Sequence, residues 1–437
     1  MTENWNRRTW RLAGPVMLSN VSVPLLGAVD MAVVGHLPGP QYLGAVAVGA
    51  MIFTIIFHSC NFLRMGTTGL TAQALGRDDP DEVRVWFLRA GLWSLAVGAA
   101  FIIFQAPISW AALKVIGPSA EVAPLAAEYY SIRILSAPAS MANYALLGWF
   151  FGIQNARAAL ITQIFLNGLN IILDFWFVMG LGWGVAGVAW ATVIGEYAAV
   201  GLGLILVVVN ARRLGGQWDF RRVFRAQRLA LMVRVNRDIF LRSMCLQITL
   251  ATFTAIGARM GDVVLAVNAI LLNMHMFMTY ALDGFANATE ALSGEALGQG
   301  NRKRFRAAIK APSRWALGFS VVLAAGFALG GPYLIDILSG DAAVREMARG
   351  YLIWAVIMPL VSVWSYQLDG VFIGATWTRE MRNGMAISMI FFMASLMALI
   401  PVLGNHGLWL SFQVFMAVRG ITLAVWFPRL ERRIGAL

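Results

Sequence analysis

The chain is 437 residues long, 59% of its residues are hydrophobic and only 13% are charged, and its mean hydropathy is +0.69. A composition this apolar excludes a soluble globular protein. The formal net charge of +12 could suggest a nucleic-acid partner, but the 34 Lys and Arg residues are scattered between apolar runs. Such cations are better interpreted as topology signals and contacts to anionic lipid, so we expect a membrane protein that binds lipid and no nucleic acid.

Twelve apolar runs are each long enough to cross a bilayer, which takes about 20 residues. The first run is too long for a signal-peptide core and lacks a small-residue cleavage site, so it should remain as the first span. Six spans are expected near residues 10–35, 42–72, 86–106, 122–148, 158–180 and 184–209. Six more are expected near residues 236–258, 262–292, 310–334, 348–374, 383–403 and 406–428. The pattern predicts an all-α membrane protein.

Positive charge is distributed very unevenly between the two sets of loops. With the N-terminus inside, 26 Lys and Arg residues fall on the cytoplasmic side, eight of them between Arg212 and Arg237, in the linker between the two sets of spans and at its end. The opposite loops carry only four, namely Lys114, Arg259, Arg345 and Arg349. Because positively charged loops are retained on the cytoplasmic side, this asymmetry predicts that both termini are cytoplasmic.

The two halves of the chain match each other at an offset of 222 residues. Thr71–Arg77 (TAQALGR) falls on Ser293–Gln299 (SGEALGQ), and Gly148–Arg157 (GWFFGIQNAR) falls on Gly370–Arg379 (GVFIGATWTR). Each copy holds six spans, an even number, so both should have the same orientation and be related by a pseudo-two-fold axis along the membrane normal. We therefore expect an N-lobe over 1–210, a cytoplasmic basic linker over 211–235 and a C-lobe over 236–437.

Seven acidic residues fall within or at the ends of the predicted spans: Asp30, Asp174, Glu196, Asp283, Glu290, Glu295 and Asp369. An acid inside a span costs about 2.5–3.5 kcal/mol on insertion scales, so each needs a partner or a function. Asp30, Asp174 and Thr192 should lie at similar depth. Asn170 is four residues before Asp174 and therefore on the same helical face, where both could bind a proton or a hard cation. Glu196, one turn beyond Thr192, could extend this group.

A second set of charged residues is expected at comparable depth in the cytoplasmic half of the membrane. It comprises Arg64, Arg242, Asp283, Glu290 and Asp369. Opposite charges there could form salt bridges that close the inner face, and a purely structural role is an equal alternative.

Other chemistry finds little support in the sequence. The four histidines, His36, His58, His275 and His406, are dispersed without metal-ligand spacing, so we expect no metal site. Phosphate-binding loops and the nucleophile and zinc motifs of hydrolases are absent, which predicts neither an enzyme nor a bound cofactor.

The matched segments, together with Leu25–Leu37 (LLGAVDMAVVGHL) and Asn236–Arg242 (NRDIFLR), resemble the multidrug and toxic compound extrusion (MATE) family, in particular its DinF-like branch. The similarity covers essentially the whole chain. It implies a transporter of the bacterial inner membrane with two six-helix lobes around a chamber. It also implies a proton- or sodium-driven antiporter that exports amphiphilic, cationic drugs or toxins, and we expect a monomer.

The same resemblance implies roles for individual residues. The family's cation site matches Asp30, Asn170, Asp174 and Thr192, and its bent first helix matches Pro15. Pro24 also removes a backbone hydrogen bond from the first helix and could allow it to bend.

Two alternatives remain open at this point. A flippase for lipid-linked saccharides would share the two-lobed architecture, although the fourteen spans and strongly cationic cavity that would favour it are not visible. A non-transporting receptor or scaffold would need an output domain, which the sequence does not show. The residues do not distinguish proton from sodium coupling and do not identify the substrate.

Overall fold

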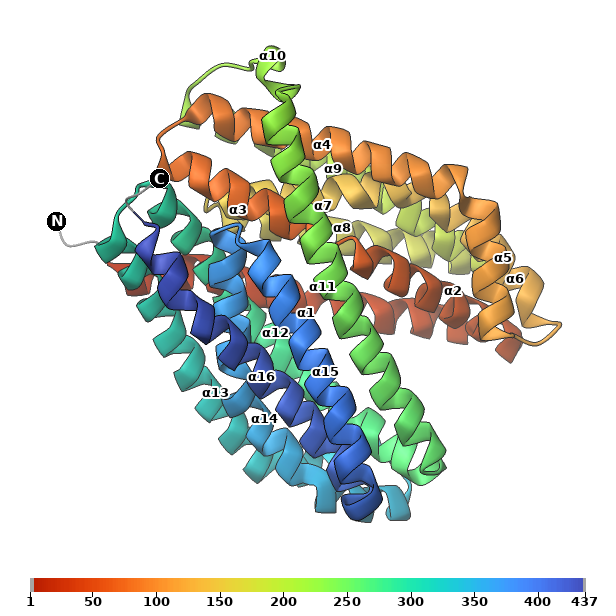
Figure 1. Ribbon diagram of the computed structural model, residues 1–437. Coiled ribbons are helices and arrows are strands. Elements are labelled where there is room, and N and C mark those ends of the chain that lie inside the picture. The colour runs from red at the N-terminus through yellow and green to blue at the C-terminus, as the bar shows by residue number, and fades with distance from the viewer. Residues whose placement is uncertain (1–3, 435–437) are drawn as a thin grey trace. The chain divides into compact units, whose positions relative to one another are not determined.

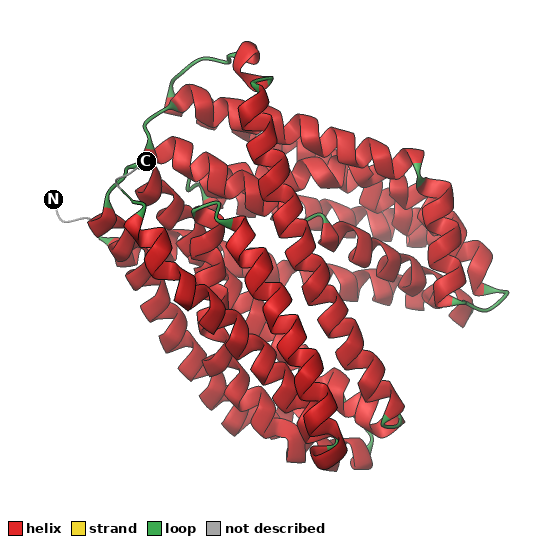
Figure 2. Ribbon diagram, in the orientation of Figure 1, coloured by secondary structure: helices red, strands yellow, loops and turns green. Residues whose placement is uncertain are grey.

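The computed structural model describes residues 4–434, except for the side chains of residues 23 and 25, and contains helices and loops but no strand in that range (Figure 2). The chain divides into two compact units (Figure 1). The first unit is Leu18–Met232. The second runs from Val233 onward and also includes the start of helix α1 (Trp5–Gly35) up to Met17.

The first unit holds the rest of α1 and the helices of the first repeat. These are α2 (Pro40–Ser59), α3 (Phe62–Gly76), α4 (Pro80–Ile103), α5 (Gln105–Ile116), α6 (Val122–Arg133), α7 (Ala137–Gly152), α8 (Ala156–Asp174), α9 (Gly184–Leu214) and α10 (Phe220–Val223). A 3₁₀ turn over Ile134–Ser136 separates α6 from α7, and a π-helical segment over Phe175–Gly180 continues α8.

The second unit is built from long helices. They are α11 (Ala226–Arg259, whose start lies in the first unit), α12 (Asp262–Gly298), α13 (Arg302–Leu338), α14 (Ala342–Gly374), α15 (Thr378–Leu403) and α16 (Asn405–Arg432).

Eleven helices of the described chain are long and apolar enough to cross a membrane. The predicted span that is not among them is 122–148, where the chain forms two shorter helices of 12 and 16 residues, α6 and α7. Pro138 lies in the first turn of α7, which fits the start of a new helix because proline lacks a backbone N–H. The expected architecture of about twelve membrane helices is therefore confirmed, with the predicted spans 42–72 and 122–148 each divided into two helices.

The internal repeat is visible in the backbone of the loops. Asp78 and Gly300, 222 residues apart, both adopt left-handed conformations, with φ of 56° and 65°. Gln154 and Thr376, separated by the same offset, do so with φ of 60° and 56°. Left-handed backbone is uncommon for residues other than glycine. Two matched pairs at one offset therefore support related folding of the two halves.

The repeated glycines mark equivalent helix crossings. A Cβ on Gly148 of α7 would lie 2.4 Å from the backbone oxygen of Arg64 on α3. A Cβ on Gly370 of α14 would lie 2.4 Å from the backbone oxygen of Ala286 on α12, and Arg64 and Ala286 are themselves 222 residues apart. Only glycine permits such close helix contact, so each repeat packs its second and fourth spans in the same way.

The segment predicted as a linker, 211–235, is largely helical. It contains the end of α9, all of α10 and the start of α11. Arg89 on α4 holds α10 by donating to the backbone oxygens of Arg222 and Val223 at 2.5 and 3.1 Å. The units also differ from the predicted ranges at the N-terminus, because the start of α1 groups with the second half of the chain.

Candidate functional site

The first unit brings Asn170, Asp174 and Thr192 together. Asp174 ends α8 and its side chain is completely buried, while Asn170 lies one turn earlier. With its amide oriented to satisfy both neighbours, Asn170 donates from Nδ2 to Asp174 Oδ2 at 2.8 Å. Its Oδ1 then lies 3.1 Å from the hydroxyl oxygen and the backbone nitrogen of Thr192 on α9. The predicted i, i+4 pair therefore joins α8 to α9.

Asp30 reaches this group from α1. Its carboxyl group lies within hydrogen-bonding range of the Asp174 carboxyl group. The Oδ1 atoms of both residues are buried, and no N–H or O–H donor of the described chain reaches them. A hydrogen bond between two carboxyl groups needs a proton on one of them, because ionised carboxylates only accept. The geometry thus brings two acidic side chains, one from α1 and one from α8, within reach of a single proton.

The surroundings hold this carboxyl pair in place. Asn167, also on α8, donates to Ser22 Oγ at 2.8 Å and fixes α1 against α8 one turn before Asn170. Directly after Asp174 the helix widens into the π-helical segment Phe175–Gly180. Such segments are rare and are found mostly as single turns at functional sites.

Arg133 is a member of the site that the sequence analysis missed. Its guanidinium lies 3.7 Å from Glu196 Oε1 and interacts electrostatically with Asp30. Asn143 Nδ2 donates to Glu196 Oε2 at 2.6 Å. Glu196 is predicted to extend the group formed by Asp30, Asn170, Asp174 and Thr192. Arg133 lies close to the Glu196 carboxylate and also interacts with the Asp30 carboxyl group, so it connects Glu196 to that group. Arg133 lies in an apolar predicted span, so its insertion cost could have identified it.

Tyr129, one turn before Arg133 on α6, faces the same group. It is 5% exposed and interacts electrostatically with Asp30, Asp174 and Arg133. The cluster therefore contains carboxyl, amide and hydroxyl oxygens with one nearby cation. Oxygen ligands of this kind suit a proton or a hard cation, and softer metals prefer nitrogen and sulfur.

The two prolines of α1 lie inside a helix that is continuous from Trp5 to Gly35. The division between the two units falls after Met17, between Pro15 and Pro24. Neither proline can donate a backbone hydrogen bond, so α1 lacks one helical hydrogen bond on each side of the boundary between the two units.

A second charged cluster lies in the second unit. Arg242 of α11 and Arg419 of α16 both donate to Oδ2 of Asp369 on α14, and all three residues are at most 5% exposed. Asp283 of α12 interacts electrostatically with both arginines. The Arg419 guanidinium also lies 5.4 Å from the ring centroid of Tyr366. Two buried cations are thus balanced by two acids.

The predicted cytoplasmic group is only partly assembled within one unit. Arg242, Asp283 and Asp369 meet as described, while Arg419 is an addition that the sequence analysis did not name. Glu290 is buried farther along α12. Arg64 belongs to the first unit, where its Nε donates to Asn61 Oδ1 at 3.0 Å and its guanidinium lies 5.8 Å from the Phe151 ring.

The similarity of this chain to known proteins covers both repeats. The MatE family model matches residues 15–176 and 239–402. The chain is 45% identical over 435 residues to the DNA damage-inducible protein F of Escherichia coli, covering 96% of this chain and 92% of the relative. It is 22% identical to the probable multidrug resistance protein NorM of Acinetobacter baylyi, covering 98% and 97% of the two chains.

A solved structure shows the same fold. The outward-facing conformation of a multidrug resistance MATE family transporter of the MOP superfamily matches with a TM-score of 0.89 at 20% identity, covering 100% of this chain and 98% of that chain. The resemblance to the MATE family and its DinF-like branch is therefore confirmed. Because the family match spans both repeats and a relative is 45% identical over nearly the whole chain, this protein belongs to the MatE family of multi-pass membrane transporters.

Proposed function

We propose that this transporter is a proton-coupled antiporter that exports amphiphilic, cationic compounds by alternating access. The observation that carries the proposal is the contact between the buried carboxyl groups of Asp30 and Asp174. Two carboxylates in contact repel each other strongly in a medium of low dielectric constant. A single proton shared between them removes this repulsion. The multidrug names of relatives support the class of substrate.

The orientation of Asn170 favours a proton over sodium at this site. In the orientation that satisfies both of its neighbours, its amide oxygen faces Thr192 and its amide nitrogen faces Asp174, so the amide presents a donor to the carboxyl pair. The Thr192 hydroxyl also lies 3.0 Å from the Val188 backbone oxygen, to which it can donate. A sodium ion needs several oxygen ligands, and an amide that presents its nitrogen to the carboxyl pair does not supply one.

Coupling would follow from the position of Asp30 on α1. A proton shared with Asp174 holds the Asp30 segment of α1 against α8, and losing that proton restores the repulsion between the carboxylates. The prolines on either side of Met17 give α1 two places to change its packing in response. In the proposed topology both termini are cytoplasmic and the protein acts as a monomer in the inner membrane.

The test is transport by the purified chain in proteoliposomes, with pH and sodium gradients imposed separately. We expect export of a fluorescent amphiphilic cation to follow the pH gradient and to be lost in Asp30→Asn and Asp174→Asn. Asp369→Asn, in the other unit, should weaken export and keep its dependence on the gradient. The carboxyl pair would be the wrong site if both N-lobe variants stayed coupled while Asp369→Asn became uncoupled.

Two further outcomes would change the proposal itself. Export driven only by the sodium gradient would replace proton coupling with sodium coupling. Transfer of a labelled lipid-linked saccharide, with no movement of amphiphilic cations under either gradient, would favour the flippase alternative.

A further inference from the structure

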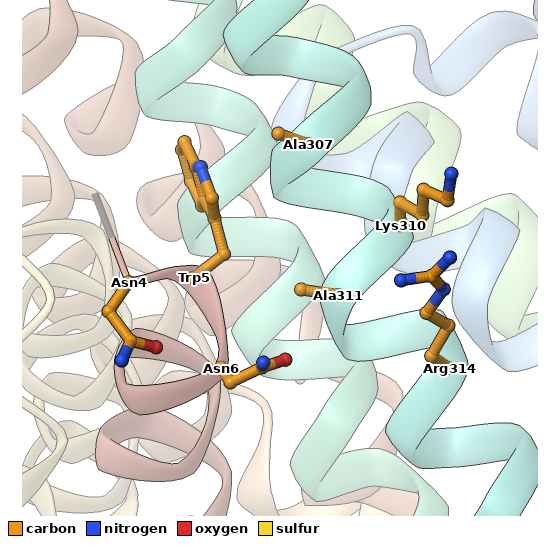
Figure 3. A pocket seen from close by; sticks show the side chains of 7 residues that line it. All are labelled: Asn4, Trp5, Asn6, Ala307, Lys310, Ala311 and Arg314. Carbon is orange, nitrogen blue, oxygen red and sulfur yellow. The ribbon is translucent and has the colours of Figure 1, made fainter. Parts of the chain in front are cut away.

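Two cavities in the second unit meet at Lys310 and Arg314 of α13. One, of about 450 Å³, lies between the start of α1 and α13, with Trp5 and Asn6 on one side and the two cations on the other (Figure 3). The second, of about 360 Å³, shares both cations. The proposed export mechanism uses neither cavity.

Within residues 4–434, the two cations have no acidic partner. Arg306, Lys310 and Arg314 are four residues apart and form one row along α13. Arg306 is paired with Glu431 of α16. Lys310 and Arg314 are exposed, and no acidic side chain within residues 4–434 lies within ion-pair distance of either. Like charges one turn apart destabilise a helix, so this pair favours an external anion.

The row ends where α13 presents an apolar surface. Trp315 and Leu317 are 41% and 39% exposed, and Val321, one turn farther, is 54% exposed. Trp315 donates from Nε1 to Asn6 Oδ1 at 3.2 Å and makes an edge contact with Trp10 at 5.3 Å. Tryptophans beside basic residues at the end of an exposed apolar helix face are typical of the membrane interface. An anion bound here would lie at the depth of the lipid headgroups.

The second cavity is mainly apolar beyond the cations. Leu317, Trp364 and Phe427 line it, contributed by α13, α14 and α16. Trp364 is 49% exposed, so the cavity opens on the surface. A free phosphate would use the two cations and leave this apolar groove empty, while a phospholipid would fill both.

We propose that Lys310 and Arg314 bind the phosphate of one anionic phospholipid, whose acyl chain lies along Leu317, Trp364 and Phe427. Trp5 and Asn6 close the opposite side of the headgroup and connect the bound lipid to the start of α1. The site belongs to the second unit alone and does not depend on proton coupling or on the exported substrate.

The test is native mass spectrometry of the full chain purified in detergent, titrated with phosphatidylglycerol or with phosphatidylcholine. The wild-type chain should retain one phosphatidylglycerol in preference to phosphatidylcholine. Since each cation near a lipid headgroup contributes about 1 kcal/mol, Lys310→Gln/Arg314→Gln should weaken this binding about thirtyfold. Lys303→Gln/Arg429→Gln, which removes the same charge outside the cavities, should bind like the wild type. Circular dichroism checks that every variant remains helical.

Two more measurements separate a lipid from a simple anion. Leu317→Gln should weaken binding of long-chain phosphatidylglycerol while a short-chain, soluble phosphatidylglycerol binds as before. Inorganic phosphate at the same concentration should not displace the lipid. Equal retention by the two charge variants, equal binding of phosphatidylcholine, or displacement by inorganic phosphate would each overturn the proposal.

Discussion

Replacing Asp369 by asparagine tests whether the buried charge cluster stabilises the second unit. The substitution keeps the shape of the side chain and leaves the guanidinium groups of Arg242 and Arg419 without their shared counter-charge. Breaking a buried ion pair by removing one partner typically costs about 3–5 kcal/mol. Asp283 interacts with both arginines and offsets part of that loss, so we expect a cost near the lower limit.

Thermal unfolding of the purified chain, followed by tryptophan fluorescence in detergent, measures this effect. For a unit of about 200 residues, 1 kcal/mol corresponds to about 2–4 °C in Tm, so a loss of about 3 kcal/mol should lower Tm by about 6–12 °C. Scan rate and detergent must be the same for all variants, because membrane proteins often unfold irreversibly.

A charge-balanced variant serves as the control. Arg242→Met/Asp369→Asn removes one cation and one acid together, leaving Arg419 opposite Asp283. If an uncompensated charge is what destabilises Asp369→Asn, the double variant should recover at least half of the lost Tm. A Tm for Asp369→Asn within 2 °C of the wild type would refute the reasoning, as would a double variant that is less stable than the single one.

Three further predictions concern the first unit and the topology. Arg133→Gln removes the cation that interacts with Asp30, so the pH of half-maximal export should rise, measured in proteoliposomes; an unchanged profile would contradict this. Gly148→Ala should destabilise the chain by about 1–3 kcal/mol because its Cβ meets backbone, while Gly201→Ala, with open space around it, should leave Tm unchanged. Arg213→Cys, made in a chain that lacks the native cysteines, should react with a membrane-impermeant maleimide only after the cells are permeabilised. Labelling in intact cells would reverse the proposed orientation.

Much of the architecture could be predicted because hydropathy and helical period are local properties. Every predicted span corresponds to helix in the structure, although 42–72 and 122–148 are each divided into two helices, and the 222-residue repeat reappears in matched left-handed turns and glycine contacts. The break at Ile134–Ser136 was not predicted, although Pro138 follows it closely. Hydropathy alone cannot detect such a break, since the residues on both sides remain apolar enough to continue one run.

The candidate site was predictable in part. Asn170 and Asp174 were placed on one helical face by their spacing, and in the structure Asn170 Nδ2, with the amide oriented to satisfy both neighbours, lies 2.8 Å from Asp174 Oδ2. Arg133 and Arg419 were not predicted as members of the two charged clusters, because the cost of burying a charge was applied mainly to acidic residues. Both arginines lie in predicted spans, so the same argument applied to cations would have selected them.

The sequence by itself determined which segments are helices and which charged residues must be buried, because both depend on residues near one another in the chain. Only the tertiary structure decided which buried charges meet. Asp369 pairs with Arg242 and Arg419, which are 127 and 50 residues away, and the start of α1 groups with the second half of the chain. Partners at such separations are selected by the packing of whole helices, and a sequence pattern that repeats every three to four residues carries no information about that packing.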